Sequence, residues 1–183
     1  MANPRPKTDT VRFRLDDAEV KRIARAIGRM DKRASKDLRD LSRDISADIV
    51  VELKNAARGT RWYRDQAVRV AESIRVASDR VPTVNIGGAR RFTNDQGERV
   101  PYGSLVFGSE FGSIEQRQRE RFRNRRQAAK GRRGGLQFPP RSPKQGRGNR
   151  GWWLFPRLKR LQPDILRAWL EGARKVADEW GKP

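Results

Sequence analysis

The stretch SKDLRDLSRDISADIVVELKNAAR, residues Ser35 to Arg58, carries the clearest periodic pattern in this 183-residue chain. Its apolar side chains recur every three or four residues, as on one face of an α-helix. These positions are Leu38, Leu41, Ile45, Ile49, Leu53 and Ala56. At about 1.5 Å per residue, the 24 residues predict a helix about 36 Å long. Ser35 is a suitable N-cap, and Gly59 is suited to a left-handed residue that ends the helix.

A shorter amphipathic helix is predicted upstream, in DAEVKRIARAIGRM at residues 17–30. Its apolar face consists of Val20, Ile23, Ala24, Ile27 and Met30. Either Asp16 or Asp17 can cap its N-terminus, where a negative charge also favours the helix dipole. The polar residues before this helix, 1–15, are expected to form a flexible N-terminal arm.

A final helix is predicted near the C-terminus. The residues Trp152, Trp153, Leu154 and Phe155 form a dense apolar anchor, and Pro163 suits the first turn of a helix that reaches Trp180. The apolar side chains of that helix are Ile165, Leu166, Trp169, Leu170, Ala173, Val176, Ala177 and Trp180. We expect this stripe, with Trp169 within it, to pack against the long helix in the core.

Between these helices the sequence changes to a strand pattern. A helical turn around Trp62 to Ser73 is followed by two predicted strands, Ile74 to Asp79 and Thr83 to Ile86, and by a polar loop with a hairpin-like turn around Asn94 to Gly97. The prediction is therefore an α+β fold, with a small antiparallel sheet packed by the long helix and the C-terminal helix. The expected organisation is an arm over 1–15, a core over 16–113, a basic insertion over 114–151 and a C-terminal helix over 152–183.

Composition narrows the function. The chain has 43 Lys and Arg against 22 Asp and Glu, a formal net charge of +21, and only 35% hydrophobic residues. Such a chain is expected either to be disordered in part or to meet a polyanion or an acidic partner. It contains no Cys and no His, which excludes disulfides, thiolate chemistry and imidazole bases. We therefore expect no enzymatic activity, no cofactor and no metal. We also expect no membrane contact, because neither a signal-peptide pattern nor a spanning apolar run is present.

Much of the charge lies in one segment. Residues Ile114 to Gly151, called the basic block below, hold 13 Lys and Arg against two acids, a net charge of +11. Its second half contains too many Gly and Pro residues for a helix or a central strand. Three interpretations remain open: a solvated tail, an arginine-rich loop beside DNA phosphates, or an arm that reaches an adjacent subunit or an acidic neighbour.

Just before the basic block lies VFGSEFGS, residues Val106 to Ser113, in which Glu110 is the one charged residue. The glycines allow close backbone approach, and the aromatic residues supply apolar area. Glu110 can pair with an arginine or accept backbone N–H bonds. The segment is either an internal turn on the domain's own core or a contact partly buried between subunits of a ring.

The order of the short motifs resembles the neck and tail-completion proteins of long-tailed bacteriophages, the family of minor tail protein Z-like and head-to-tail connector proteins. The matching residues are Ser73-Ile74, Tyr102 with Val106, Glu110-Phe111-Gly112, and Leu154-Phe155-Pro156 before Leu158. The resemblance covers residues 37–180 without the basic block, which is far longer than the family's ordinary connection at that point.

The resemblance implies a structural virion protein that joins head to tail as part of a ring around the DNA path, assembled in the bacterial cytoplasm. It implies a homo-oligomer, six-fold or alternatively twelve-fold, among neighbouring neck and tail proteins. The expected subunit or partner contacts are Phe107, Glu110, Phe111, Phe138, Trp152 and Trp153. The residues expected to face DNA or an acidic partner are Arg117, Arg119, Arg121, Arg123, Arg125, Arg126, Arg132 and Arg133.

A second function fits the same charge. The stretch RFRNRRQAAKGRRGG, residues 121–135, is typical of arginine-rich segments that become ordered on nucleic acid, which would make the chain an RNA- or DNA-binding module of ribosomal-protein or nucleoid type. Against this, Phe122 is nearly the only aromatic residue near that stretch, whereas single-strand binding relies on stacking.

Overall fold

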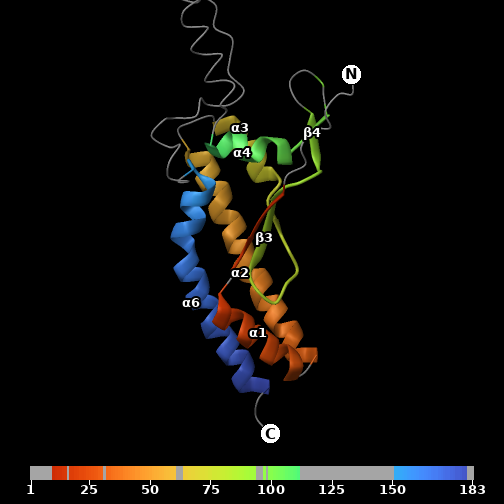
Figure 1. Ribbon diagram of the computed structural model, residues 1–183, viewed down its shortest axis with the longest axis vertical. Helices are drawn as coiled ribbons and strands as arrows, with labels where there is room; N and C mark the ends of the chain where they lie inside the picture. The colour runs from red at the N-terminus through yellow and green to blue at the C-terminus, as the bar shows by residue number, and fades with distance from the viewer. Residues whose placement is uncertain are drawn as a thin grey trace, which may run out of the picture.

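The computed structural model describes residues 10–15, 17–30, 32–60, 64–93, 97, 99–111 and 151–180. Two long helices dominate it: α2 (Lys32–Gly59) and α6 (Leu154–Trp180) run side by side along most of the molecule (Figure 1). At 28 residues, α2 is about 42 Å long. The two helices approach closely at Gly172, where the side chain of Leu41 occupies the space that a Cβ would need. The long amphipathic helix predicted from the sequence is confirmed, and it packs against α6 as expected.

The ends of α2 differ from the prediction. The helix begins at Lys32, so Ser35 lies inside it and is not the N-cap. The hydroxyl of Ser35 is buried and accepts hydrogen bonds from the side chains of Arg39 and Arg80. Gly59 is the last helical residue and has no left-handed conformation. The serine therefore serves a tertiary contact in place of a cap.

The start of α6 also differs from the prediction. The helix begins nine residues before Pro163, which lies inside it and not in its first turn. Pro163 has no N–H to donate to the carbonyl of Lys159, but both residues are exposed, so this break in the ladder lies on the solvent side. The apolar anchor at 152–155 is thus continuous with the C-terminal helix.

The first helix, α1 (Ala18–Met30), matches its prediction, and Asp17 is its N-cap. The Asp17 carboxylate accepts hydrogen bonds from the backbone N–H groups of Glu19 and Val20 at 2.8 and 3.4 Å. Val20, Ala24 and Ile27 are buried on one face, which packs against α2 and α6. The helical turn expected near residue 62 is the short helix α3 (Arg64–Glu72).

Three strands form the main sheet: β1 (Thr10–Arg14), β2 (Arg75–Val76) and β3 (Thr83–Gly87). The order is β1-β3-β2 and both pairings are antiparallel. The structure thus corrects the flexible arm expected over 1–15: residues 10–14 are a strand and Leu15 is buried, while residues 1–9 lie outside the described residues. The cause is tertiary, because Val11 and Phe13 pair with residues of β3 that lie some seventy positions further along the chain.

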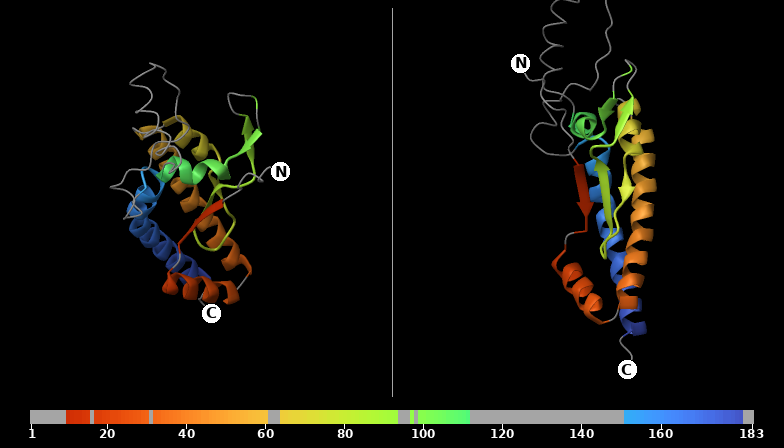
Figure 2. Two further views of the ribbon diagram at one scale, coloured as in Figure 1. Left: turned by 45° about the horizontal axis from the view of Figure 1, so that its top comes forward. Right: turned by 90° about the vertical axis from the view of Figure 1, so that its right-hand side faces the viewer.

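A second, two-stranded sheet is formed by β4 (Arg91–Thr93) and β5 (Arg99–Pro101), which confirms the hairpin expected in the polar loop. It leads into α4 (Gly103–Phe111), a helix that crosses the end of the molecule near the start of α6 (Figures 1 and 2). The fold is α+β, as predicted. One hydrophobic core contains side chains from both sides of the basic block, from Leu15 to Val176.

A candidate assembly site at the junction of α4 and α6

The segment that precedes the basic block is the helix α4, and not the internal turn that was one of its two interpretations. Nothing local favours this, because Gly103 and Gly108 are poor helix formers and the apolar residues follow no single helical stripe. The surroundings supply the reason. The N–H of Gly103 donates to the carbonyl of Gly88, and Leu105, Val106, Ser109 and Glu110 are all buried against neighbouring elements.

Glu110 is the central residue of this junction. Its side chain is fully buried, and its carboxylate accepts hydrogen bonds from backbone N–H groups at the start of α6. One oxygen, Oε2, accepts from the N–H groups of Trp153 at 3.1 Å and Leu154 at 2.9 Å, and Oε1 accepts from that of Phe155 at 2.9 Å. The next residue, Pro156, has no N–H. The first turn of α6 is therefore almost fully satisfied by one carboxylate from another helix.

The electrostatics of Glu110 reflect two opposed causes. Burial raises the pKa of the Glu110 carboxyl above its ordinary value, while hydrogen bonds from the backbone N–H groups of residues 152–155 act to lower it. Burial has the larger effect, so the net shift is upward. The positive end of the α6 dipole also lies at this carboxylate. Of the two partners expected for Glu110, the structure selects backbone N–H groups.

Gly151 makes room for this carboxylate. It has a φ of +57°, the left-handed region that glycine tolerates, and a Cβ at this position would overlap the Glu110 carboxyl group. The residue before the tryptophan pair must therefore be glycine if Glu110 is to reach the end of α6.

Replacing Gly151 with alanine should lower the free energy of unfolding by at least about 2 kcal/mol, because the left-handed backbone and the overlap with Glu110 act together. Gly97→Ala is the matched control, since Gly97 has a φ of +80° but nothing within 4 Å of its added Cβ. Urea unfolding of both variants measures the difference. Equal losses would mean that Gly151 matters only for its backbone conformation.

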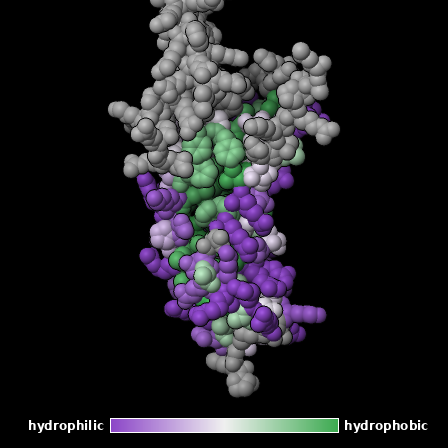
Figure 3. All heavy atoms as spheres, viewed as in Figure 1, coloured by the Kyte–Doolittle hydropathy of each residue, from purple (hydrophilic) through white to green (hydrophobic). Residues whose placement is uncertain are grey.

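Beside the buried carboxylate, three phenylalanines form a strip on the surface. Phe111 stacks on Phe155 with ring centroids 5.4 Å apart and on Phe107 at 6.4 Å. Phe107 is 45% exposed, which is unusual for a large apolar side chain. We call Phe107, Phe111 and Phe155 the aromatic strip. Figure 3 shows hydrophobic side chains gathered over α4 and the start of α6, while hydrophilic ones cover the other half of this face.

The tryptophan pair lies behind the strip. Trp153 is buried and Trp152 is half-buried, and both line a hollow of about 410 Å³ between the end of α2 and the start of α6. Arg157, which pairs with Glu52 of α2, lines it as well. The indole N–H of Trp153 and the Nε of Arg157 are buried without an acceptor among the described residues.

The predicted contact residues therefore fall into three groups. Phe107 is exposed, and Phe111 and Trp152 are half-buried. Glu110 and Trp153 are buried inside the subunit, which corrects the expectation that they contact a partner: the Glu110 carboxylate is fully occupied by its own chain. The remaining predicted residues lie outside the described residues. They are Phe138, Arg117, Arg119, Arg121, Arg123, Arg125, Arg126, Arg132 and Arg133.

The same hydrogen bonds fix where the basic block leaves and rejoins the fold. Glu110 lies one residue before the end of α4, and its partners begin at Trp153, two residues after the block. Both flanks of a segment with a net charge of +11 are thereby held at one end of the molecule. Local sequence patterns do not predict which backbone groups Glu110 meets, because the partners are 43 to 45 residues apart.

Comparisons of the chain with protein-family models, with curated proteins and with solved structures found no match. Within the described part of the chain, no group of three or more acidic side chains is placed to hold a metal ion. No helix in that part is both long and apolar enough to cross a bilayer.

Proposed function

We propose that this protein is a structural component of the head-to-tail junction of a tailed bacteriophage. In this proposal it acts without catalysis, as one subunit of a ring that joins neighbouring neck and tail proteins around the DNA path. A subunit with this function needs a stable body, a surface for lateral contacts and positive charge directed toward DNA or an acidic neighbour. The two long helices, the aromatic strip and the basic block correspond to these three requirements.

One observation carries the proposal. The short motifs behind the resemblance to neck proteins lie far apart in sequence but form connected contacts in the fold. The Glu110 carboxylate accepts the N–H groups of Leu154 and Phe155, and the ring of Phe111 stacks on that of Phe155. The hydroxyl of Ser73 accepts the N–H of Gly87, and α4 packs on α3 and β3.

The aromatic strip is the proposed lateral contact. Phe107 is half-exposed on a helix whose other side is buried, and the strip lies beside both flanks of the basic block. Ring closure would bury Phe107 and bring several basic blocks together. Because like charges repel, closure requires DNA, acidic neighbours or salt to offset that repulsion.

Replacing Phe107 with serine should leave the melting temperature of the subunit nearly unchanged and abolish ring formation. Sedimentation and negative-stain images at about 1 M salt, where the Debye length is about 3 Å, are the measurement. Val51→Ser is the control, since Val51 is 55% exposed on α2 and is not part of the strip, and this variant should still form rings. A Phe107→Ser variant that forms rings like the wild type would exclude the strip as the contact.

The proposed function itself is tested in particles. The gene for the chain should lie beside genes for portal, capsid and tail-tube proteins of a phage. Antibodies against the chain should label the junction between head and tail in virions of that phage. If the chain is absent from virions and instead sediments with ribosomes or nucleoid, the alternative of a basic RNA- or DNA-binding module would replace the proposal.

A further inference from the structure

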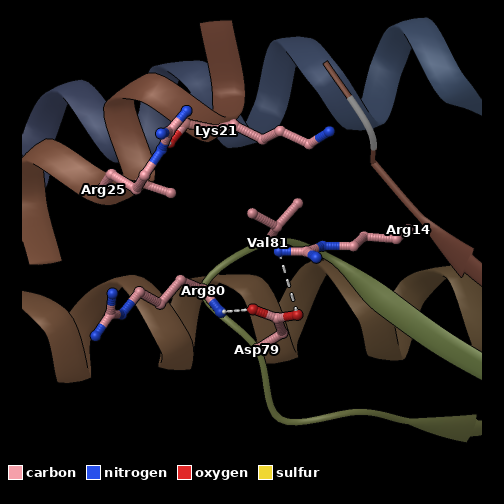
Figure 4. Close-up of a pocket in the computed structure, with 7 residues that line it drawn as sticks. Arg14, Lys21, Arg25, Asp79, Arg80 and Val81 are labelled. Atoms are coloured by element: carbon pink, nitrogen blue, oxygen red, sulfur yellow. Dashed lines mark hydrogen bonds and ion pairs between the residues drawn. The ribbon is translucent and has the colours of Figure 1, made fainter. Parts of the chain in front are cut away.

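A second cluster of cations lies between α1 and the turn that connects β2 to β3. Arg14 comes from β1, Lys21 and Arg25 come from α1, and Asp79 and Arg80 come from the turn (Figure 4). Together with Ala24 and Val81 they line a hollow of about 300 Å³. We call this hollow the basic pocket. Four of its seven lining residues are cationic and one is acidic, so it carries a clear positive excess.

The one acid of the pocket is already shared by two arginines. The Asp79 carboxylate lies 3.5 Å from the guanidinium of Arg14 and 3.6 Å from that of Arg12. Its other oxygen accepts the N–H of Arg80 at 2.7 Å. Since one negative charge serves two guanidiniums that are 42% and 55% exposed, both retain donors that face solvent.

Arg25 and Arg80 each make a further hydrogen bond. The Nε of Arg25 donates to the carbonyl of Lys21 at 3.1 Å. The Nε of Arg80 donates to the buried hydroxyl of Ser35 at 3.0 Å, and its guanidinium lies over Gly28, where a Cβ would overlap it. Arg14, Lys21 and Arg25 are exposed, so their charges remain available to an anion in solution, whereas the Arg80 guanidinium is directed toward Ser35 and Gly28.

We propose that the basic pocket binds the phosphate backbone of duplex nucleic acid, as a site separate from the basic block. Guanidinium groups match phosphate oxygens in geometry and charge. A protein partner usually needs a pocket with apolar surface for an anchoring side chain. The apolar lining residues here are Ala24, which is small, and Val81, which is almost fully buried, so the pocket offers little such surface. It also lacks an aromatic side chain for stacking a base among its described lining residues, which favours a duplex over a single strand.

The proposal does not depend on ring formation or on the phage assignment. It concerns sequence-independent contacts, whose strength falls with salt because each neutralised phosphate releases a counterion. The basic block contributes to the same salt dependence, so the test compares variants of the full chain that differ only in the pocket or only elsewhere.

The first test removes charge. The triple variant Arg14→Gln, Lys21→Gln, Arg25→Gln should weaken binding of a fluorescent 20-base-pair duplex by at least about tenfold at 0.1 M salt, and reduce the slope of log affinity against log salt by roughly 2 to 3. The control, Lys159→Gln, Arg167→Gln, Arg174→Gln, removes the same charge from exposed positions of α6 and should lose much less. Equal losses in the two triples would overturn the proposal, because net charge alone would then explain binding.

The second test removes the one negative charge of the pocket. Asp79→Asn keeps an acceptor for the Arg80 N–H but frees Arg12 and Arg14 from their counter-ion, so duplex affinity should rise several-fold. Asp164→Asn, on the exposed side of α6, changes the net charge equally and should have a smaller effect. An unchanged affinity in Asp79→Asn would contradict the proposal. A second contradicting result would come from a fluorescent poly-glutamate peptide. If the triple variant of Arg14, Lys21 and Arg25 lost more affinity for this peptide than for the duplex, the pocket would bind an acidic protein instead.

Discussion

Replacing Glu110 with alanine should lower the free energy of unfolding by about 3–5 kcal/mol, the largest loss expected from any carboxylate among the described residues. The variant leaves three backbone N–H groups at the start of α6 without their acceptor, and two of their residues are buried. Each unsatisfied buried donor costs about 1–3 kcal/mol. Urea unfolding followed by circular dichroism at 222 nm measures the loss.

Glu110→Gln separates charge from shape. Because the pKa of Glu110 is raised in the folded state, the folded protein binds this proton more tightly than the unfolded chain does. Its contribution to stability is therefore greatest below the ordinary pKa of about 4.5 and declines as pH rises through the folded pKa. The stability difference between wild type and Glu110→Gln should shrink as pH rises over this window. A difference that grows with pH would reverse the sign of the shift.

Trp169→Ala should also destabilise the isolated subunit by about 3–5 kcal/mol, the usual cost of removing a buried tryptophan. Trp169 is fully buried on the face of α6 that packs against α2. Its indole N–H lies 3.1 Å from both the hydroxyl of Ser42 and the carbonyl of Arg80. The side chain thus joins three elements: α6, α2 and the turn that carries the basic pocket.

Trp169→Phe is the control that keeps most of the apolar volume and removes the N–H donor. It should lose less than the alanine variant, and the remaining loss reports on the contacts to Ser42 and Arg80. Thermal unfolding of both variants measures this. If Trp169→Ala kept the wild-type melting temperature but failed to assemble, the residue would belong to an interface between subunits and not to the core.

These two residues have different consequences for assembly. Glu110 holds together the two flanks of the basic block, whereas Trp169 holds the helices and the β2–β3 turn. Loss of Glu110 should therefore impair assembly through a loosened junction even where the rest of the core survives. Phe107→Ser acts on the contact surface alone, so comparison of the two variants separates a structural defect from a lost interface.

The amino-acid sequence by itself determined the elements whose signal is local. Helices α1 and α2 and the C-terminal part of α6 follow from apolar residues at helical spacing, because residues three and four positions apart lie on the same face of a helix. An aspartate cap for α1 also follows from the sequence, which offers Asp16 and Asp17, and the structure shows that Asp17 accepts the hydrogen bonds. Absence of Cys and His likewise excludes thiolate and imidazole chemistry without any structure.

The tertiary structure decided what depends on distant partners. Five alternating residues, 10–14, become a strand only because β3 offers an edge to pair with. α4 is helical despite its glycines, because its surroundings bury it. The start of α6 lies at Leu154 because the Glu110 carboxylate satisfies N–H groups that would otherwise lack acceptors. The candidate sites divide in the same way: the basic block is visible in composition, whereas the basic pocket draws its cations from three segments that only folding brings together.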